Sequence, residues 1–156
     1  MSALVSPPAG RALQELVNRV SHRGGAALAI MGEAQVTLTQ VMLMTRLDEG
    51  GALSVSQLAE GLNLSRPAAS QAIERLVRLG LITRIEDPED RRRKIVSLGP
   101  DGARLLGRLV DARTAEYSAA LNRAPAALQA KLAAILVEVL ESLAHDDPSG
   151  RSGEGG

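Results

Sequence analysis

A mainly helical fold with one small β-hairpin is predicted for this chain of 156 residues. Aliphatic residues recur at three- and four-residue spacing along most of the chain, which is the pattern of helices that pack through one face. β-Branched residues concentrate in two short segments, 81–86 and 94–98, on either side of a polar turn, which is typical of a hairpin. Gly or Pro residues lie between most of the predicted elements, as at Gly50-Gly51, Gly80 and Gly99-Pro100.

The composition restricts the class of protein. Hydrophobic residues make up 45% of the chain, but there is no Phe or Trp and a single Tyr, so the core must be aliphatic. Cysteine is absent, which excludes disulfides and thiolate metal sites and fits a reducing compartment. No signal peptide and no apolar stretch of membrane-spanning length is visible. We therefore expect a cytoplasmic protein with no membrane partner.

The N-terminal part predicts a tail and two helices. Residues 1–10 contain two prolines and a glycine and are expected to be a disordered tail. Apolar spacing predicts one helix over residues 11–31, weakened and kinked at Gly24-Gly25. A second helix is expected from about residue 39 to 48.

Two short helices joined by a tight turn are predicted next. Ser54 and Gln57 have the spacing of a capping box at the start of the first one. Ser65 is a suitable N-cap for the second, and Pro67 lies in its first turn, where a missing N–H does no harm. This helix is expected over residues 65–79, with Gly80 as its C-cap.

The hairpin and two further helices complete the prediction. Strands 81–86 and 94–98 flank the polar turn, after which helices are expected from Gly99 to about Asn122 and from Pro125 to about His145. Residues 146–156, rich in Gly, Ser and acids, are expected to be a disordered tail. Helix, tight turn, helix and hairpin in this order form a winged helix-turn-helix, here flanked by long N- and C-terminal helices.

Charge and motifs indicate the class of function. The formal net charge is zero, but residues 65–98 carry eight basic and five acidic side chains, a net charge of +3. A helix of about four turns fits the major groove of duplex DNA, and a basic hairpin tip can enter the minor groove. We see no phosphate-binding loop, no nucleophile elbow and no zinc-ligand spacing, so we expect neither an enzyme nor a metal or cofactor.

The helix over residues 65–79 divides into two faces at about 100° per residue. The face predicted to pack inward carries Ala69, Ile73, Leu76 and Val77. On the opposite face, the residues expected to contact base edges are Pro67, Ala68 and Gln71. Those expected to contact phosphates are Ser65, Ser70, Arg75 and Arg78. Arg66 falls nearer the buried side, and its role is left open.

Several segments together resemble the MarR family of regulators. They are TLTQ at residues 37–40, VSQLA at 55–59, DPEDRR at 87–92 and VSLGPDG at 96–102. The most specific part is the Asp87-x-x-Asp90-x-Arg92 signature, and the order of helices extends the resemblance over residues 11–145.

The resemblance implies a homodimeric regulator of transcription, usually a repressor. Residues 11–35 and 99–145 would form dimerisation helices, and residues 36–98 the winged helix-turn-helix domain that binds double-stranded DNA. Arg91, Arg92 and Arg93 of the wing would bind DNA, while Asp87 and Asp90 would brace its tip. Many relatives are released from DNA by small molecules, so an effector is implied as well, although sensing through a cysteine is excluded here.

Alternatives remain open at this stage. The apolar terminal helices exceed what a small winged core can cover, which favours a dimer, although they could also fold back on their own core. Asp87, Glu89 and Asp90 could be a metal or carboxylate site, but a solvated turn beside arginines is the simpler interpretation. Tyr117 could lie in the core, at an interface or in an effector pocket. The winged helix could also bind a protein instead of DNA.

Overall fold

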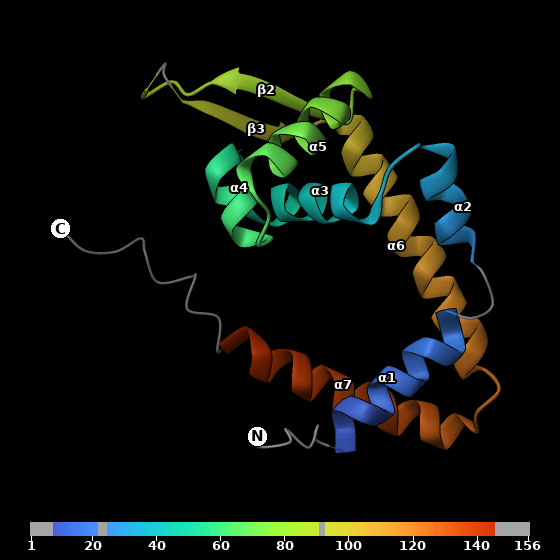
Figure 1. Ribbon diagram of the computed structural model, residues 1–156. Coiled ribbons are helices and arrows are strands. Elements are labelled where there is room, and N and C mark those ends of the chain that lie inside the picture. The colour runs from blue at the N-terminus through green and yellow to red at the C-terminus, as the bar shows by residue number, and fades with distance from the viewer. Residues whose placement is uncertain (1–7, 22–24, 91–92, 146–156) are drawn as a thin grey trace, which may run out of the picture. The chain divides into compact units, whose positions relative to one another are not determined.

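The computed structural model describes residues 8–21, 25–90 and 93–145 (Figure 1). Two compact units divide the chain, the first ending at Glu116 and the second beginning at Tyr117, within helix α6 (Pro100–Leu121). The first unit contains, in order, α1 (Pro8–Ser21), α2 (Ala26–Glu33), α3 (Leu38–Gly50), β1 (Leu53–Ser54), α4 (Val55–Gly61), α5 (Arg66–Arg78), β2 (Ile82–Glu86), β3 (Lys94–Leu98) and most of α6. The second contains the end of α6 and α7 (Ala126–His145).

Two capping boxes fix the starts of α3 and α4. The Gln40 N–H donates to Thr37 Oγ1 at 3.3 Å, and the Thr37 N–H donates to Gln40 Oε1 at 2.9 Å. Ser54 and Gln57 form the same pair of bonds, at 3.2 and 2.8 Å, as the sequence predicts. Each box satisfies N–H groups that a helix start would otherwise leave unpaired.

The tight turn and the cap of α5 also agree with the sequence. Asn63 adopts a left-handed backbone conformation, with φ of 52°, in the turn after α4. Ser65 Oγ then accepts the Ala68 N–H at 3.3 Å. At the other end, the C-cap is Leu79 and not the predicted Gly80, which follows it with φ of 73°, a conformation that glycine adopts without strain.

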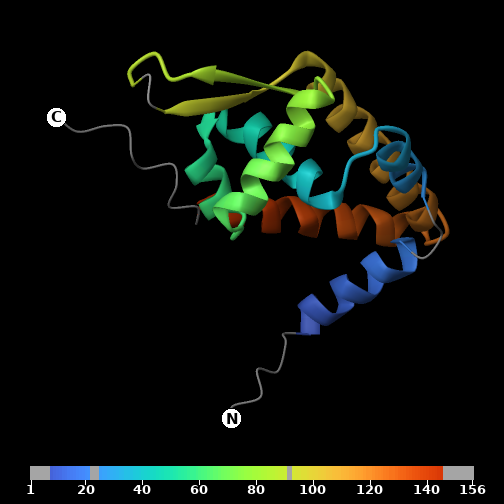
Figure 2. The same ribbon diagram turned by 45° about the horizontal axis from the view of Figure 1, so that its top comes forward.

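The strands form one antiparallel sheet in the order β1-β3-β2. The predicted hairpin is confirmed, with Ile82 opposite Leu98 and Glu86 opposite Lys94. Figures 1 and 2 show this hairpin extending as an arm from the helices around it. β1 was not predicted, because two residues that pair with β3 are too few to show a strand pattern.

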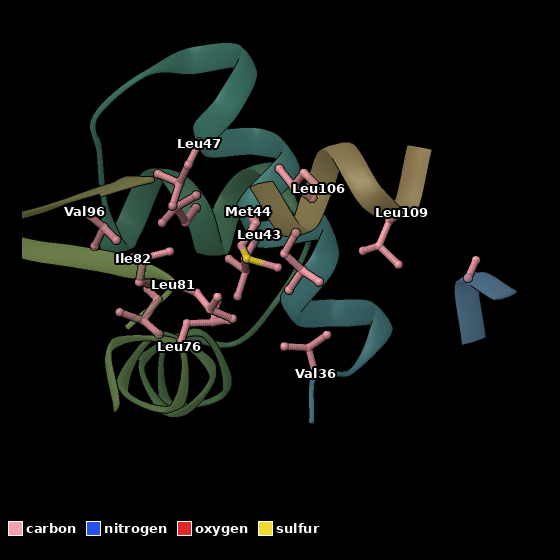
Figure 3. Packing of buried hydrophobic residues seen from close by; sticks show 14 residues of the cluster. Val36, Leu43, Met44, Leu47, Leu76, Leu81, Ile82, Val96, Leu106 and Leu109 are labelled. Atoms are coloured by element: carbon pink, nitrogen blue, oxygen red, sulfur yellow. The ribbon is translucent and has the colours of Figure 1, made fainter. Parts of the chain in front are cut away.

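The core of the first unit is aliphatic and centres on α3. Leu43 and Met44 have no exposed surface. Figure 3 shows them surrounded by side chains from other elements: Leu76 of α5, Ile82 of β2, Val96 of β3, and Leu106 and Leu109 of α6. The winged helix thus packs α5 and the hairpin against the same hydrophobic centre.

The prediction of one helix over residues 11–31 is wrong. The structure has two helices: α1 begins at Pro8 and ends at Ser21, and α2 begins after Gly25, whose backbone is extended. The described chain is not helical at Gly25, where a kink was expected, and the Glu116 carboxylate of α6 accepts the Ala27 N–H at 3.3 Å at the start of α2. A Cβ on Gly25 would overlap that carboxylate.

The first unit includes more of the chain than the predicted winged helix-turn-helix domain of residues 36–98. Ala27 belongs to its core, and Ile30 and Met31 pack against that core, while the dimerisation role of residues 11–35 stays a prediction. The core also extends past residue 98 into α6. Of the expected tails, residues 8–10 are helical, whereas residues 1–7 and 146–156 lie outside the described residues.

The second unit leaves an apolar helix uncovered. Large apolar side chains of α7 are exposed around the whole helix: Leu128, Ile135, Leu136, Val137, Val139, Leu140 and Leu143. A helix that is apolar all round is normally buried. Among the residues described, no single helix is long and apolar enough to cross a membrane. The helices α2 and α3 meet these two criteria only as a pair, and they are bent by 92° relative to each other.

Candidate nucleic-acid interface

Helix α5 has one buried face and one exposed face. Ala69, Ile73 and Leu76 each have 0% of their surface exposed. Pro67, Ala68, Gln71, Glu74 and Arg78 are all exposed. The three residues predicted to contact base edges therefore lie on the face turned away from the core.

Two residues on the flank of α5 depart from the predicted faces. Val77 was expected to pack inward, but 38% of its surface is exposed. Arg66, expected near the buried side, is exposed. Viewed down the helix axis, the buried face of α5 is centred on a direction between Ala69 and Leu76, and the half-buried Ala72 lies on the side away from Val77. At about 100° per residue, Val77 lies about 90° from that direction, at the edge of the buried face.

Arg75 is held by a residue that the sequence did not single out. Arg75 is half-buried, and its Nη2 donates to Gln35 Oε1 at 3.3 Å. Gln35 follows α2 and has a φ of 55°, in the left-handed region. No local signal connects these residues, because they are 40 positions apart.

A hollow of about 380 Å³ lies between the start of α3 and the exposed side of α5. Four of its lining residues are predicted DNA contacts: Ala68, Gln71, Arg75 and Arg78. The others are Ala72 and two residues of the α3 capping box, Thr37 and Gln40. The capping-box motif in the sequence could have placed the start of α3, but not its position beside α5.

Two serines of the predicted interface differ in their surroundings. Ser65 is exposed and its Oγ accepts the Ala68 N–H, so the same hydroxyl caps the helix. A hydroxyl that accepts a hydrogen bond still has a hydrogen to donate. Ser70 is half-buried on the flank of α5.

The wing turn is closed by backbone hydrogen bonds. The Asp87 N–H donates to the Arg93 carbonyl at 2.9 Å, and the Arg93 N–H donates to the Asp90 carbonyl at 2.8 Å. The Asp87 carboxylate also accepts the Glu89 N–H at 3.0 Å. Arg93 is exposed, whereas the predicted contacts Arg91 and Arg92 lie outside the described residues.

Comparisons with known proteins agree with this arrangement. Residues 36–94 match the model of the MarR family. The HTH-type transcriptional regulator FarR of Neisseria gonorrhoeae is 29% identical over 117 residues, covering 73% of this chain and 80% of that protein.

Solved structures show the same fold. Transcriptional regulator Tm0710 from Thermotoga maritima aligns with a TM-score of 0.75 at 18% identity, covering 89% of this chain and 96% of its own. A mutant of S. aureus MepR bound to an oligodeoxyribonucleotide aligns with a TM-score of 0.65 at 19% identity, covering 88% and 99%. The match of residues 36–94 to the MarR family, the related regulator and the shared fold identify a MarR-type winged-helix domain in this chain and support a DNA-binding transcriptional regulator.

Proposed function

We propose that the chain binds a specific DNA sequence through the exposed face of α5 in the major groove and the wing, residues 87–93, in the adjacent minor groove. The observation that carries this proposal is the division of α5: one face is fully buried, while the other presents polar and small side chains near the helix start. Helices that enter the major groove contact bases through their N-terminal residues.

Each exposed residue of α5 has a role suited to its chemistry. The Gln71 amide can form two hydrogen bonds with adenine, and Pro67 and Ala68 can contact thymine methyl groups. Phosphate contacts are assigned to the hydroxyls and guanidinium groups of Ser65, Ser70, Arg75 and Arg78. In the wing, the arginines at 91–93 are assigned to the minor groove, where closely spaced phosphates favour arginine.

We further propose that two copies form a homodimer through their apolar terminal helices. The support is α7, because seven of its large apolar side chains are exposed in one copy, including Leu140 at 64%. A twofold dimer would present two α5 helices about 34 Å apart, which matches a pseudopalindromic site. Such a dimer bound at a promoter would block transcription, so we assign a repressor role.

Any small-molecule effector of this chain should be held mainly by aliphatic contacts. The sequence contains no Phe or Trp and one Tyr, Tyr117, which is half-buried. Each copy would therefore offer a single large aromatic ring for stacking on an aromatic effector.

Binding to duplex DNA at graded salt tests the proposal. Each phosphate contact contributes about 0.9 to the slope of log affinity against log salt, so a steep negative slope is expected. Arg92→Ala should weaken binding and leave the free energy of unfolding nearly unchanged. If Arg92→Ala bound as tightly as the parent, the role of the wing would be wrong. If the parent preferred no duplex at low salt, a winged helix that binds protein would be the better interpretation.

A further inference from the structure

We propose that the hollow between α3 and α5 binds one phosphate of the DNA backbone, and that Gln35 is a positioning residue that presents Arg75 to it. The inference rests on the proposed DNA binding and extends the interface to an element outside the helix-turn-helix and the wing. It is built from the residues that line the hollow and from the hydrogen bond behind it.

The described lining of the hollow is cationic and contains no carboxylate. Arg75 and Arg78 both line it, and residues three apart on a helix are neighbours on its surface. Two guanidinium groups repel each other unless an anion lies between them, and their planar forks match phosphate oxygens. The charge of the hollow therefore favours a phosphate.

Gln35 holds Arg75 without neutralising it. The Gln35 amide oxygen accepts one N–H of Arg75, at 3.3 Å, and a guanidinium carries five such donors. An acidic residue at position 35 would compete with a phosphate for the positive charge, whereas a neutral amide leaves it available. Arg75 thus keeps both its charge and further donors.

The backbone of Gln35 supports a role for its side chain. A φ of 55° is unfavourable for a residue with a Cβ, and glycine would adopt it without that penalty. The side chain at this position nevertheless reaches Arg75. A glycine at position 35 would lose the side-chain hydrogen bond to Arg75.

The opposite wall of the hollow offers a further donor. Thr37 Oγ1 accepts the Gln40 N–H at 3.3 Å, and its own hydrogen can still be donated to a phosphate oxygen. Ala68 and Gln71, the proposed base contacts, line the same hollow. A phosphate held here would therefore fix the register of α5 against the bases, which is the general role of backbone contacts.

The decisive variant is Gln35→Gly, because it removes the amide while relaxing the backbone. We expect a free energy of unfolding equal to or above that of the parent, as for the stability control Asn63→Gly, whose native φ is 52°. DNA affinity should fall roughly two- to tenfold, because Arg75 would no longer be held in place before binding, and ordering one long side chain on binding lowers affinity by about this factor. The selected base sequence should not change, because a phosphate contact carries no sequence information.

A double-mutant cycle separates positioning from a general loss of structure. Arg75→Ala should lower the salt slope by about 0.9, and Gln35→Gly should add little further loss on that background. Arg108→Ala, which removes an exposed arginine paired with Glu33, serves as the control for charge and should bind as the parent does.

The outcomes distinguish this inference from the proposed function. If the parent binds DNA and Gln35→Gly binds with the same affinity, the inference is wrong while the proposed function stands. The inference is also overturned if Gln35→Gly weakens the parent and Arg75→Ala by the same factor. If the parent itself binds no duplex, the proposed function fails first.

Discussion

Two glycines of α6 should respond to alanine with different signs. Gly102 is buried where α6 passes the end of α5 and the hairpin: a Cβ there would overlap the Leu81 carbonyl oxygen and lie 2.7 Å from Leu98 Cδ1. Gly107, on the same helix, has no atom within 4 Å of the corresponding position. Comparing Gly102→Ala with Gly107→Ala therefore separates the effect of the close contact at Gly102 on stability from the effect of helix propensity, which both substitutions share.

The magnitudes follow from two opposing terms. Alanine is favoured over glycine inside a helix by about 0.8–1 kcal/mol, so Gly107→Ala should raise the free energy of unfolding by that amount. Gly102→Ala gains the same propensity but overpacks the site at a cost of about 1–3 kcal/mol. Relief is difficult because the Leu81 carbonyl also accepts the Gly99 N–H, at 2.9 Å. The two variants should thus differ by about 1–3 kcal/mol.

Urea denaturation followed by circular dichroism measures the difference. All proteins should be compared at one protomer concentration, because the proposed dimerisation would make stability depend on concentration. For a chain of this size, 1 kcal/mol corresponds to about 2–4 °C in Tm. If Gly102→Ala were stabilised as much as Gly107→Ala, the packing of α6 against Leu81 would be refuted.

Two further predictions concern the core and the dimer. Ile73→Ala removes a side chain with no exposed surface and should lower the free energy of unfolding by about 2–5 kcal/mol, whereas Val77→Ala on the same helix, 38% exposed, should cost clearly less in the same denaturation assay. Leu140→Glu should shift the mass measured by light scattering from dimer to monomer. It should not unfold the single chain, because 64% of the Leu140 surface is exposed in one copy. Glu138→Lys, which changes the charge of an exposed residue on the same helix, is the control and should stay dimeric.

The elements with local signals could be predicted from the sequence. The cap at Ser65 and the capping box at Ser54 depend on residues within one helical turn, and both are present as predicted. The hairpin could be predicted because its two strands are close in the sequence and rich in β-branched residues. The exposed face of α5 followed from the helical repeat alone.

The features that the sequence did not predict depend on distant contacts. β1 is a strand only because Leu53 and Ser54 pair with β3. The start of α2 involves the Glu116 carboxylate, 89 positions from Ala27, so the sequence around Gly25 could not distinguish a kink from a break. The support of Arg75 by Gln35 is equally non-local. Predictions for single residues were therefore wrong or missing where contacts between residues distant in the sequence determine which local conformation forms.

The most direct test of the central claim is selection of bound sites from random duplex DNA by the parent and by Gln71→Ala. If α5 presents its exposed face to the bases, the parent should select two related half-sites about one helical turn apart. Gln71→Ala should then lose the preference at one position in each half-site. A parent that selects no sequence, or a Gln71→Ala profile identical to that of the parent, would contradict the account.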